Sequence, residues 1–252
     1  MAPDAGGAKP LTSMDRKARK KAVLSLRDAF FSGVYDDVLR RTVDSASFEF
    51  ADDDAAFVVG ALAFAGRVEE GRAVLAGWDT SSTRRSLSAE SRCAARFFLG
   101  VAYCRSGRFA DATAMFSETM KIARADRGPG ALFYMHQGFG CLRYFTGRIA
   151  HSGRHALRAL RCAYTARFQY GRFLATDLRG HALVETGSVR AGLALLKQAK
   201  EIAEAMGLAG NAGALECTMT VFAASFGTKP IAESIEDLER LVVAAPARDS
   251  YS

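Results

Sequence analysis

Histidine and arginine side chains recur at helical spacing between positions 151 and 161. They are His151, Arg154, His155, Arg158 and Arg161. Spacings of three and four positions place side chains on one face of a helix. Such a basic face is either an ordinary solvated surface or a docking surface for an acidic protein segment or for nucleic-acid phosphates. The surrounding stretch contains no lysine and no nucleic-acid-binding motif, so an acidic protein is the favoured partner and nucleic acid the less favoured one.

The excess positive charge of the chain is concentrated in the region that contains this helical face. The formal charge of all 252 residues is +7. Residues 143–190 contain nine arginines and only two acids, Asp177 and Glu185, so this stretch alone equals the whole excess. In the rest of the chain the positive and negative charges cancel. The positive charge is therefore local and belongs to a part of the fold.

Catalysis and metal binding are poorly supported. His151 and His155 lie four positions apart, but zinc needs a third and usually a fourth ligand. The remaining histidines, His136 and His181, form no recognisable motif with them. The sequence has no phosphate-binding loop and no nucleophile elbow of the G-x-S-x-G type. We predict no catalytic residue, no metal site, no cofactor and no enzymatic activity.

Composition predicts a cytoplasmic protein without a membrane span. The longest uncharged run, residues 55–66, has 12 residues, whereas a spanning helix needs about 20. No apolar signal-peptide segment follows the basic start. The five cysteines are scattered, as is typical of a reducing compartment. We expect them to pack as small apolar side chains.

The elements that position these side chains follow an internal repeat. Pairs of glycines separated by seven positions return with a period of 40 residues: Gly100 and Gly107, Gly140 and Gly147, Gly180 and Gly187. An apolar residue stands two positions after each second glycine, and a small residue five positions after it. Agreement at several offsets indicates a repeated structural unit.

Each unit is predicted to be a helical hairpin. Apolar residues recur at helical spacing before each second glycine. That glycine ends the first helix, because glycine adopts the left-handed C-terminal conformation without a steric penalty. Small residues such as Gly100 and Ala112 let the two helices approach closely.

Two weaker copies precede these three units and one follows them. We predict six helix pairs, starting near residues 22, 53, 90, 131, 171 and 211. The polar residues 78–88 are predicted to form a loop, with Ser88 as the cap of the next helix. The predicted domains are a disordered basic tail at 1–21, a helical repeat domain at 22–245, and a tail or linker at 246–252.

The third unit resembles the tetratricopeptide repeat. Leu99-Gly100-x2-Tyr103-x3-Gly107-x-Phe109-x2-Ala112-x3-Phe116 matches the signature of that family, with Arg96 in place of its leading tryptophan. The period of 40 is closer to the longer-helix branch, which resembles maltose-activator-like regulators and kinesin light chains, than to the usual unit of about 34 residues. The resemblance implies an all-α, right-handed superhelical solenoid. Its concave groove, lined by the first helix of each pair, would hold a peptide or a protein helix.

The geometry of that family also implies which side chains face the groove. The candidate groove residues are Phe97, Tyr134, Gln137, Cys141, Tyr144 and His181. Aromatic side chains with a polar tip are good anchors for a peptide, although some of these side chains could instead form the core between repeats.

Three hypotheses about function remain open at this point. The leading one is a non-enzymatic scaffold or adaptor that binds a protein partner in the groove or on the arginine face. The second is a sensor module of a larger signalling or transcription regulator. The third is nucleic-acid binding through the arginine face. Self-association is also left open, and the identity of any partner is not encoded in a recognisable motif.

Overall fold

The computed structural model describes residues 25–42, 54–80 and 87–244. Within these ranges the chain is all-helical and has no strand. The helices of these ranges are α2 (Leu26–Phe31), α3 (Tyr35–Thr42), α4 (Ala55–Phe64), α5 (Val68–Thr80), α6 (Ala89–Arg105), α7 (Phe109–Asp126), α8 (Pro129–Phe145), α9 (Ile149–Thr165), α10 (Gln169–Glu185), α11 (Val189–Ala205), α12 (Ala209–Ser225) and α13 (Ile231–Ala244). The tails predicted at 1–21 and 246–252 lie outside the described residues.

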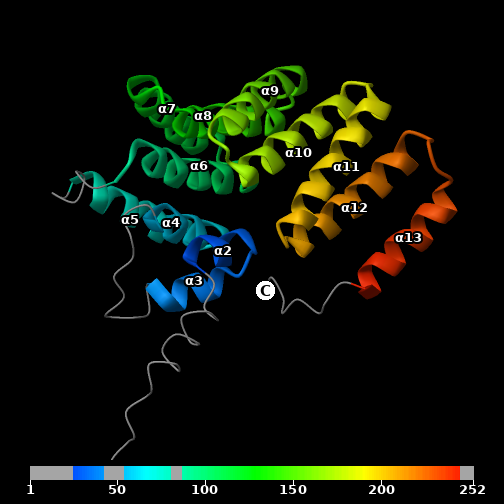
Figure 1. Cartoon of the computed structure of the whole chain (residues 1–252), viewed down its shortest axis with the longest axis horizontal. Coiled ribbons are helices and arrows are strands. Elements are labelled where there is room, and N and C mark those ends of the chain that lie inside the picture. Colours follow the sequence, from blue (N-terminus) through cyan, green and yellow to red (C-terminus); the bar gives the residue numbers. More distant parts are fainter. Residues whose placement is uncertain (1–24, 43–53, 81–86, 245–252) are drawn as a thin grey trace, which may run out of the picture.

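The helices pack in chain order along an arc (Figure 1), each one against the next. They form six successive pairs, close to the starts expected from the repeat, so the predicted all-helical repeat architecture is confirmed for the described residues. The first helices of successive pairs also pack side by side, from α2 through α4, α6 and α8 to α10. This second set of contacts builds a continuous inner layer.

The turns inside the pairs have the predicted backbone. Gly107, Gly147 and Gly187 have φ angles of 74°, 73° and 89°, which lie in the left-handed region. Gly100 has a different role: a Cβ atom on it would overlap the ring of Phe116 on α7. The first glycine of the unit therefore permits close packing, and the second permits the turn.

One boundary of the prediction is wrong. We expected residues 78–88 to form a loop, but α5 continues to Thr80, so Trp78 is helical. The helix persists because Trp78 packs against the core. The capping prediction is confirmed: the Ser88 hydroxyl accepts a hydrogen bond of 3.1 Å from the backbone N–H of Ser91.

Arg96, the residue that departs from the repeat signature, is buried and paired. Its Nε lies 3.0 Å from Glu118 of α7, and another of its nitrogens lies 2.5 Å from Asp79 of α5. A guanidinium has several donors in a fixed plane and can serve two carboxylates at once. Arg96 thus joins α5, α6 and α7 through ion pairs. An aromatic side chain at this position, such as the tryptophan of the repeat signature, would instead join them by packing.

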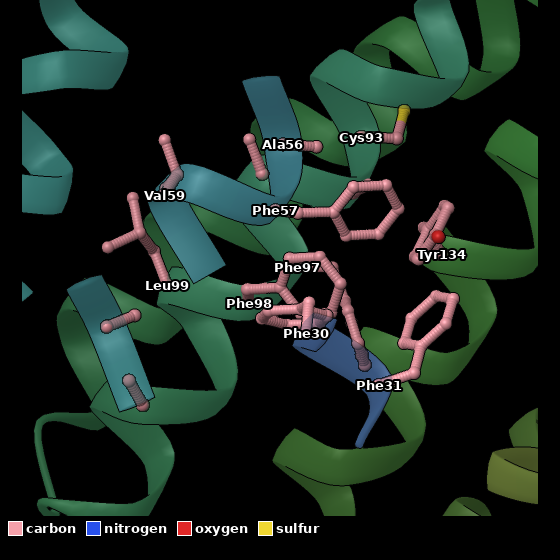
Figure 2. Close-up of a cluster of buried hydrophobic side chains, with 14 of the residues drawn as sticks. Phe30, Phe31, Ala56, Phe57, Val59, Cys93, Phe97, Phe98, Leu99 and Tyr134 are labelled. Carbon is pink, nitrogen blue, oxygen red and sulfur yellow. The ribbon is translucent and has the colours of Figure 1, made fainter. Parts of the chain in front are cut away.

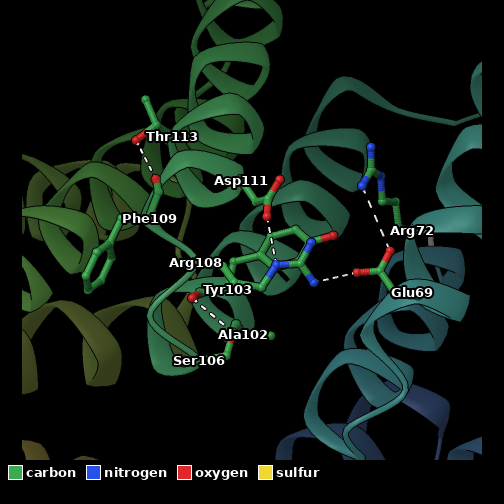
Figure 3. Close-up of polar contacts among 9 residues, drawn as sticks. All are labelled: Glu69, Arg72, Ala102, Tyr103, Ser106, Arg108, Phe109, Asp111 and Thr113. Carbon is green, nitrogen blue, oxygen red and sulfur yellow. Dashed lines mark hydrogen bonds and ion pairs between the residues drawn. The ribbon is translucent and has the colours of Figure 1, made fainter.

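A second ion-pair network links neighbouring pairs on the surface (Figure 3). Arg108, in the turn before α7, lies 2.7 Å from Asp111 and also pairs with Glu69 of α5. Its guanidinium stacks over the ring of Tyr103 at 4.4 Å. All three groups of the ion-pair network are partly exposed, so the network fixes the turn more than it stabilises the fold.

The largest aromatic cluster lies where α2 meets the inner layer (Figure 2). Phe30 packs against Phe57 and Phe98, with ring centroids 5.3 Å and 4.7 Å away. Phe31 packs on the other side, stacked on Tyr170 at the start of α10 with a centroid distance of 4.0 Å. The first described helix therefore lies on the inner side of the arc and contacts the fifth pair. Nothing in the repeat pattern predicts this contact.

No helix in the described part of the chain is long and apolar enough to cross a bilayer.

Candidate functional site: a cavity on the inner helix layer

The inner layer contains a partly open cavity of about 230 Å³ between α4, α6, α8 and α10. Its walls are mainly apolar and aromatic, with a few polar side chains from α8 and α10. The lining residues are Phe64, Phe97, Phe98, Val101, Gln137, Cys141, Tyr144, Phe145, Tyr170, Leu174, Asp177, Leu178 and His181. A concave apolar site with few convergent polar groups is the usual form of a small binding site.

The 40-residue period explains why these side chains meet. Residues 97, 137 and 177 occupy equivalent positions on α6, α8 and α10, and residues 101, 141 and 181 form a second equivalent set. Both sets line the cavity. Because the three helices lie side by side, equal register brings equivalent side chains to one place. The site is thus a product of the repeat.

Five of the six candidate groove residues lie around this cavity: Phe97, Gln137, Cys141, Tyr144 and His181. The sixth, Tyr134, does not. It is 3% exposed and packs among Phe97, Phe133 and Phe168. Tyr134 lies one helical turn before Gln137 on α8. Phe168, in the connection between α9 and α10, covers it. Tyr134 belongs to the core between repeats, the second role that the sequence left open.

Gln137 is held firmly in the cavity wall. The side chain is 2% exposed, and its Nε2 donates a hydrogen bond of 3.1 Å to the backbone carbonyl of Leu174 on α10. This bond fixes the orientation of the amide. Its Oε1 atom is buried and accepts no hydrogen bond from the protein. An unfilled acceptor therefore remains beside the cavity.

Tyr144 and His181 form the polar end of the cavity. The Tyr144 hydroxyl donates a hydrogen bond to Glu185 and lies 3.4 Å from Nδ1 of His181. Burial, together with this hydrogen bond, raises the pKa of Tyr144. Burial alone would lower the pKa of His181, but the nearby Asp177 carboxylate, with Oδ1 3.3 Å from Nε2, holds that pKa above its usual value.

Eight of the 13 lining residues were not among the candidate groove residues, and Phe64 and Tyr170 show why. Phe64 comes from α4, in a pair whose repeat signal is weak, and Tyr170 comes from the first turn of α10. Tyr170 stands seven positions before Asp177, so helical spacing alone places it on the same side. No sequence signal indicates that Phe31 of α2 covers the other face of its ring.

The predicted basic face divides into two parts. His151, Arg154, Arg158 and Arg161 are exposed on α9. They lie opposite the buried small residues Ser152, Ala156, Ala159 and Ala163 of the same helix. None of the nine arginines between 143 and 190 forms an ion pair with a described residue. The face is therefore a strip of uncompensated positive charge.

His155 does not belong to the exposed strip. It is half-buried, and its Nδ1 lies 3.4 Å from Nδ1 of His136 on α8. Burial and the neighbouring Arg158 lower the pKa of His155, and burial together with His155 lowers the pKa of His136 to about 4. His155 lies three to four positions from both Ser152 and Ala159, so it stands at the edge of the buried side. The five residues of the spacing argument are therefore not all solvent-facing.

The described residues contain no cluster of three or more ligands for a metal ion. The five cysteines are free. Cys93 and Cys104 are buried, and burial raises the pKa of each thiol to about 12. Cys141, Cys162 and Cys217 are only partly buried, in contrast to the expectation of uniform packing.

Compared with family models, with curated proteins and with solved structures, the chain matches none of them. The resemblance to the tetratricopeptide repeat thus stays an interpretation of the sequence.

Proposed function

We propose that this chain is a non-enzymatic protein–protein interaction module built as a right-handed superhelical solenoid of tetratricopeptide type. It binds a segment of a partner protein on its inner helix layer. The observation that carries the proposal is the cavity of about 230 Å³ that five candidate groove residues line. It is smaller than the 300–1,000 Å³ typical of drug-sized ligands. It suits one anchoring group of a longer segment.

The chain itself supplies a precedent for such binding. α2 has only six residues, yet it seats Phe30 and Phe31 among aromatic rings of α4, α6 and α10. Short helical segments with aromatic anchors are a common way to fill a groove. The inner layer therefore accepts a short aromatic helix, and the cavity lies next to the place where it does so.

A second candidate surface is the exposed arginine strip of α9. Arg154, Arg158 and Arg161 have no acidic partner among the described residues, so their charge is available to an acidic protein segment. Nucleic-acid phosphates would use the same charge. Attraction of this kind acts over about 8 Å at physiological ionic strength, and binding through the strip should weaken with salt.

A sensor role is the remaining alternative. The cavity lies between four successive pairs, so a ligand there would contact α4, α6, α8 and α10 together. Such a ligand would stabilise one spacing of the pairs over others. This role requires an effector that responds to the change.

The test compares proteins and nucleic acids captured from a native lysate by the wild-type chain and by three variants. Tyr144→Ala removes a cavity side chain. Tyr164→Ala is the matched control, because Tyr164 is an exposed tyrosine on α9. The third variant reverses Arg154, Arg158 and Arg161 to Glu.

Partners that bind the wild type and Tyr164→Ala but not Tyr144→Ala support the inner-layer site. Partners lost only after charge reversal assign binding to the arginine strip, and RNA or DNA among them assigns it to nucleic acid. Capture that is the same for all four proteins contradicts the proposal.

A further inference from the structure

The cavity has an unusual combination of walls and polar atoms. Aromatic rings of Phe97, Phe98, Tyr144 and Tyr170 surround it. The faces of aromatic rings carry negative charge density and attract cations. The walls alone therefore favour either an apolar group or an organic cation.

Two buried acceptors at the cavity separate these alternatives. Oε1 of Gln137 accepts no hydrogen bond from the protein, and Oδ1 of Asp177 has only the ion pair with His181, whose Nε2 lies 3.3 Å away. Leaving a buried acceptor unpaired costs about 1–3 kcal/mol. A ligand that brings N–H groups to these atoms recovers that energy, whereas a hydrocarbon ligand does not.

Two of the donor groups on the protein side are already occupied. Nε2 of Gln137 is bonded to the Leu174 carbonyl, and the Tyr144 hydroxyl donates to Glu185. Among the lining residues, two donor groups remain: the Tyr170 hydroxyl and His181, which lies beside the Asp177 carboxylate. A ligand that needs donors, such as a carboxylate or a phosphate, thus finds little at this site.

The distribution of charge also favours a cation. No lysine or arginine lines the cavity, although nine arginines lie between residues 143 and 190. The two acids of that stretch, Asp177 and Glu185, both lie at the polar end of the cavity. The fold therefore separates the charges: the arginine strip is exposed on α9, and the carboxylates are inside the arc.

We infer that the cavity binds an organic cation whose apolar part contacts the aromatic walls and whose N–H groups donate to Gln137 and Asp177. The cation is either a free amine or the basic side chain of a docked segment. This inference rests on the proposed inner-layer site and specifies its ligand chemistry. It also assigns the two candidate surfaces opposite preferences, since the arginine strip selects acidic partners.

The experiment titrates the full chain with 2-phenylethylammonium and follows binding by NMR. The uncharged 2-phenylethanol and the anionic 3-phenylpropionate are the comparison probes. The titration is run at pH 8 and repeated at pH 7, because a proton on His181 would compete for the Asp177 carboxylate and the higher pH lowers the share of protonated His181. We expect saturable binding of the cation, and binding of the other two probes that is weaker by roughly tenfold, a difference of about 1.4 kcal/mol.

Two variants test the named acceptors. Asp177→Asn keeps the shape of the side chain and removes its charge, and Gln137→Leu removes the unfilled acceptor. Each should weaken binding of the cation by roughly tenfold. Glu201→Gln is the matched control, because Glu201 is an exposed acid on α11, and it should leave the affinity unchanged. Thermal unfolding of each variant confirms that it is folded.

A peptide pair identifies the source of the cation. Acetyl-Leu-Lys-Phe-amide is compared with the same peptide acetylated on the lysine Nε. Tighter binding of the unmodified peptide than of 2-phenylethylammonium indicates the side chain of a docked segment, and the reverse order indicates a free amine. Equal binding of the two peptides would contradict recognition of a lysine cation.

The inference fails if the wild-type chain does not bind the cation saturably, or if Asp177→Asn binds it as tightly as the wild type. That failure is distinct from failure of the proposed function. Lysate partners that depend on Tyr144 while the cation does not bind leave the interaction module intact and overturn its ligand chemistry. If the cation binds but no protein is captured from the lysate, the ligand chemistry stands and the interaction module is overturned.

Discussion

Arg127 and Arg167 occupy a backbone conformation that favours glycine. Their φ angles are 59° and 52°, and both stand between the second helix of one pair and the first helix of the next. Gly207 holds the equivalent place one period later, with a φ angle of 72°. An L-residue pays roughly 1–2 kcal/mol for a left-handed conformation. These two turns therefore carry strain that the third does not.

Replacing Arg167 with Gly should stabilise the protein. The substitution removes the steric cost, and part of that gain is lost because glycine is more flexible in the unfolded chain. We expect a net gain of roughly 0.5–1 kcal/mol in the free energy of unfolding, measured with urea. Gly147→Val, the opposite change at a left-handed position, should cost roughly 1 kcal/mol or more. Equal stability of both variants would contradict this account of the turns.

The half-buried pair of His136 and His155 should make stability depend on pH. The pKa of His136 is lowered to about 4 in the folded chain, against about 6.5 when unfolded. Between these values the unfolded chain binds more protons, so stability is fully present above about pH 6.5 and falls as the pH drops toward 4.

The measurement is the urea midpoint at pH 7, 5.5 and 4.5 for the wild type, His136→Gln and the exposed control His151→Gln. The three proteins have the same carboxylates, so protonation of those groups lowers the stability of all three equally. His136→Gln should lose less stability between pH 7 and 4.5 than the other two. A loss identical in all three proteins would show that the pair does not contribute.

At the scale of helices, the close contacts between the two helices of a pair decide which glycines tolerate a methyl group. Gly100→Ala would place a Cβ atom against the Phe116 ring, closer than normal packing allows. Overpacking of this kind costs about 1–3 kcal/mol. At Gly213 in α12, an added Cβ atom would meet no neighbouring atom within 4 Å, so Gly213→Ala should gain roughly 0.5–1 kcal/mol from helix propensity.

Thermal unfolding of these two variants gives opposite expected shifts for the same substitution. A melting temperature that rises in both variants would show that α6 and α7 have room to separate at Gly100.

The glycine periodicity was sufficient to predict the helix pairs, because a left-handed turn and a tight crossing each demand a specific residue type. It could not predict Arg127 and Arg167 as turn residues, since arginine occurs in every kind of structure. The cavity was partly predictable for a related reason. The 40-residue register placed residues 97, 137 and 177 on one side. Which of its two possible roles Tyr134 has could not be predicted, because its contact with Phe168 depends on tertiary packing.

At the scale of the whole molecule, the uncompensated arginines should make stability sensitive to salt. Like charges on one surface repel, and added salt screens that repulsion. The melting temperature of the wild type should therefore rise between low and moderate salt. Neutralising Arg154, Arg158 and Arg161 to Gln should reduce this rise, while each exposed substitution changes stability by roughly 0.5 kcal/mol or less.

Melting curves at several NaCl concentrations for the two proteins test this expectation. The matched control neutralises the surface arginine Arg108, which already has Glu69 and Asp111 as partners. For Arg108→Gln the salt-dependent rise should be at least as large as in the wild type. A triple variant with an undiminished rise would contradict the view that the strip is unpaired.

The contact between Phe31 and Tyr170 also has a consequence for biosynthesis. The two residues are 139 positions apart in the chain. At 5–20 residues per second, a ribosome needs on the order of 10 s to add the second after the first. Throughout that interval α2 has no α10 to dock against, and the Phe31 ring lacks its stacking partner. The Phe31 ring of the nascent chain is therefore accessible to chaperones during this interval, and its docking completes the inner layer only after the fifth helix pair has begun to emerge.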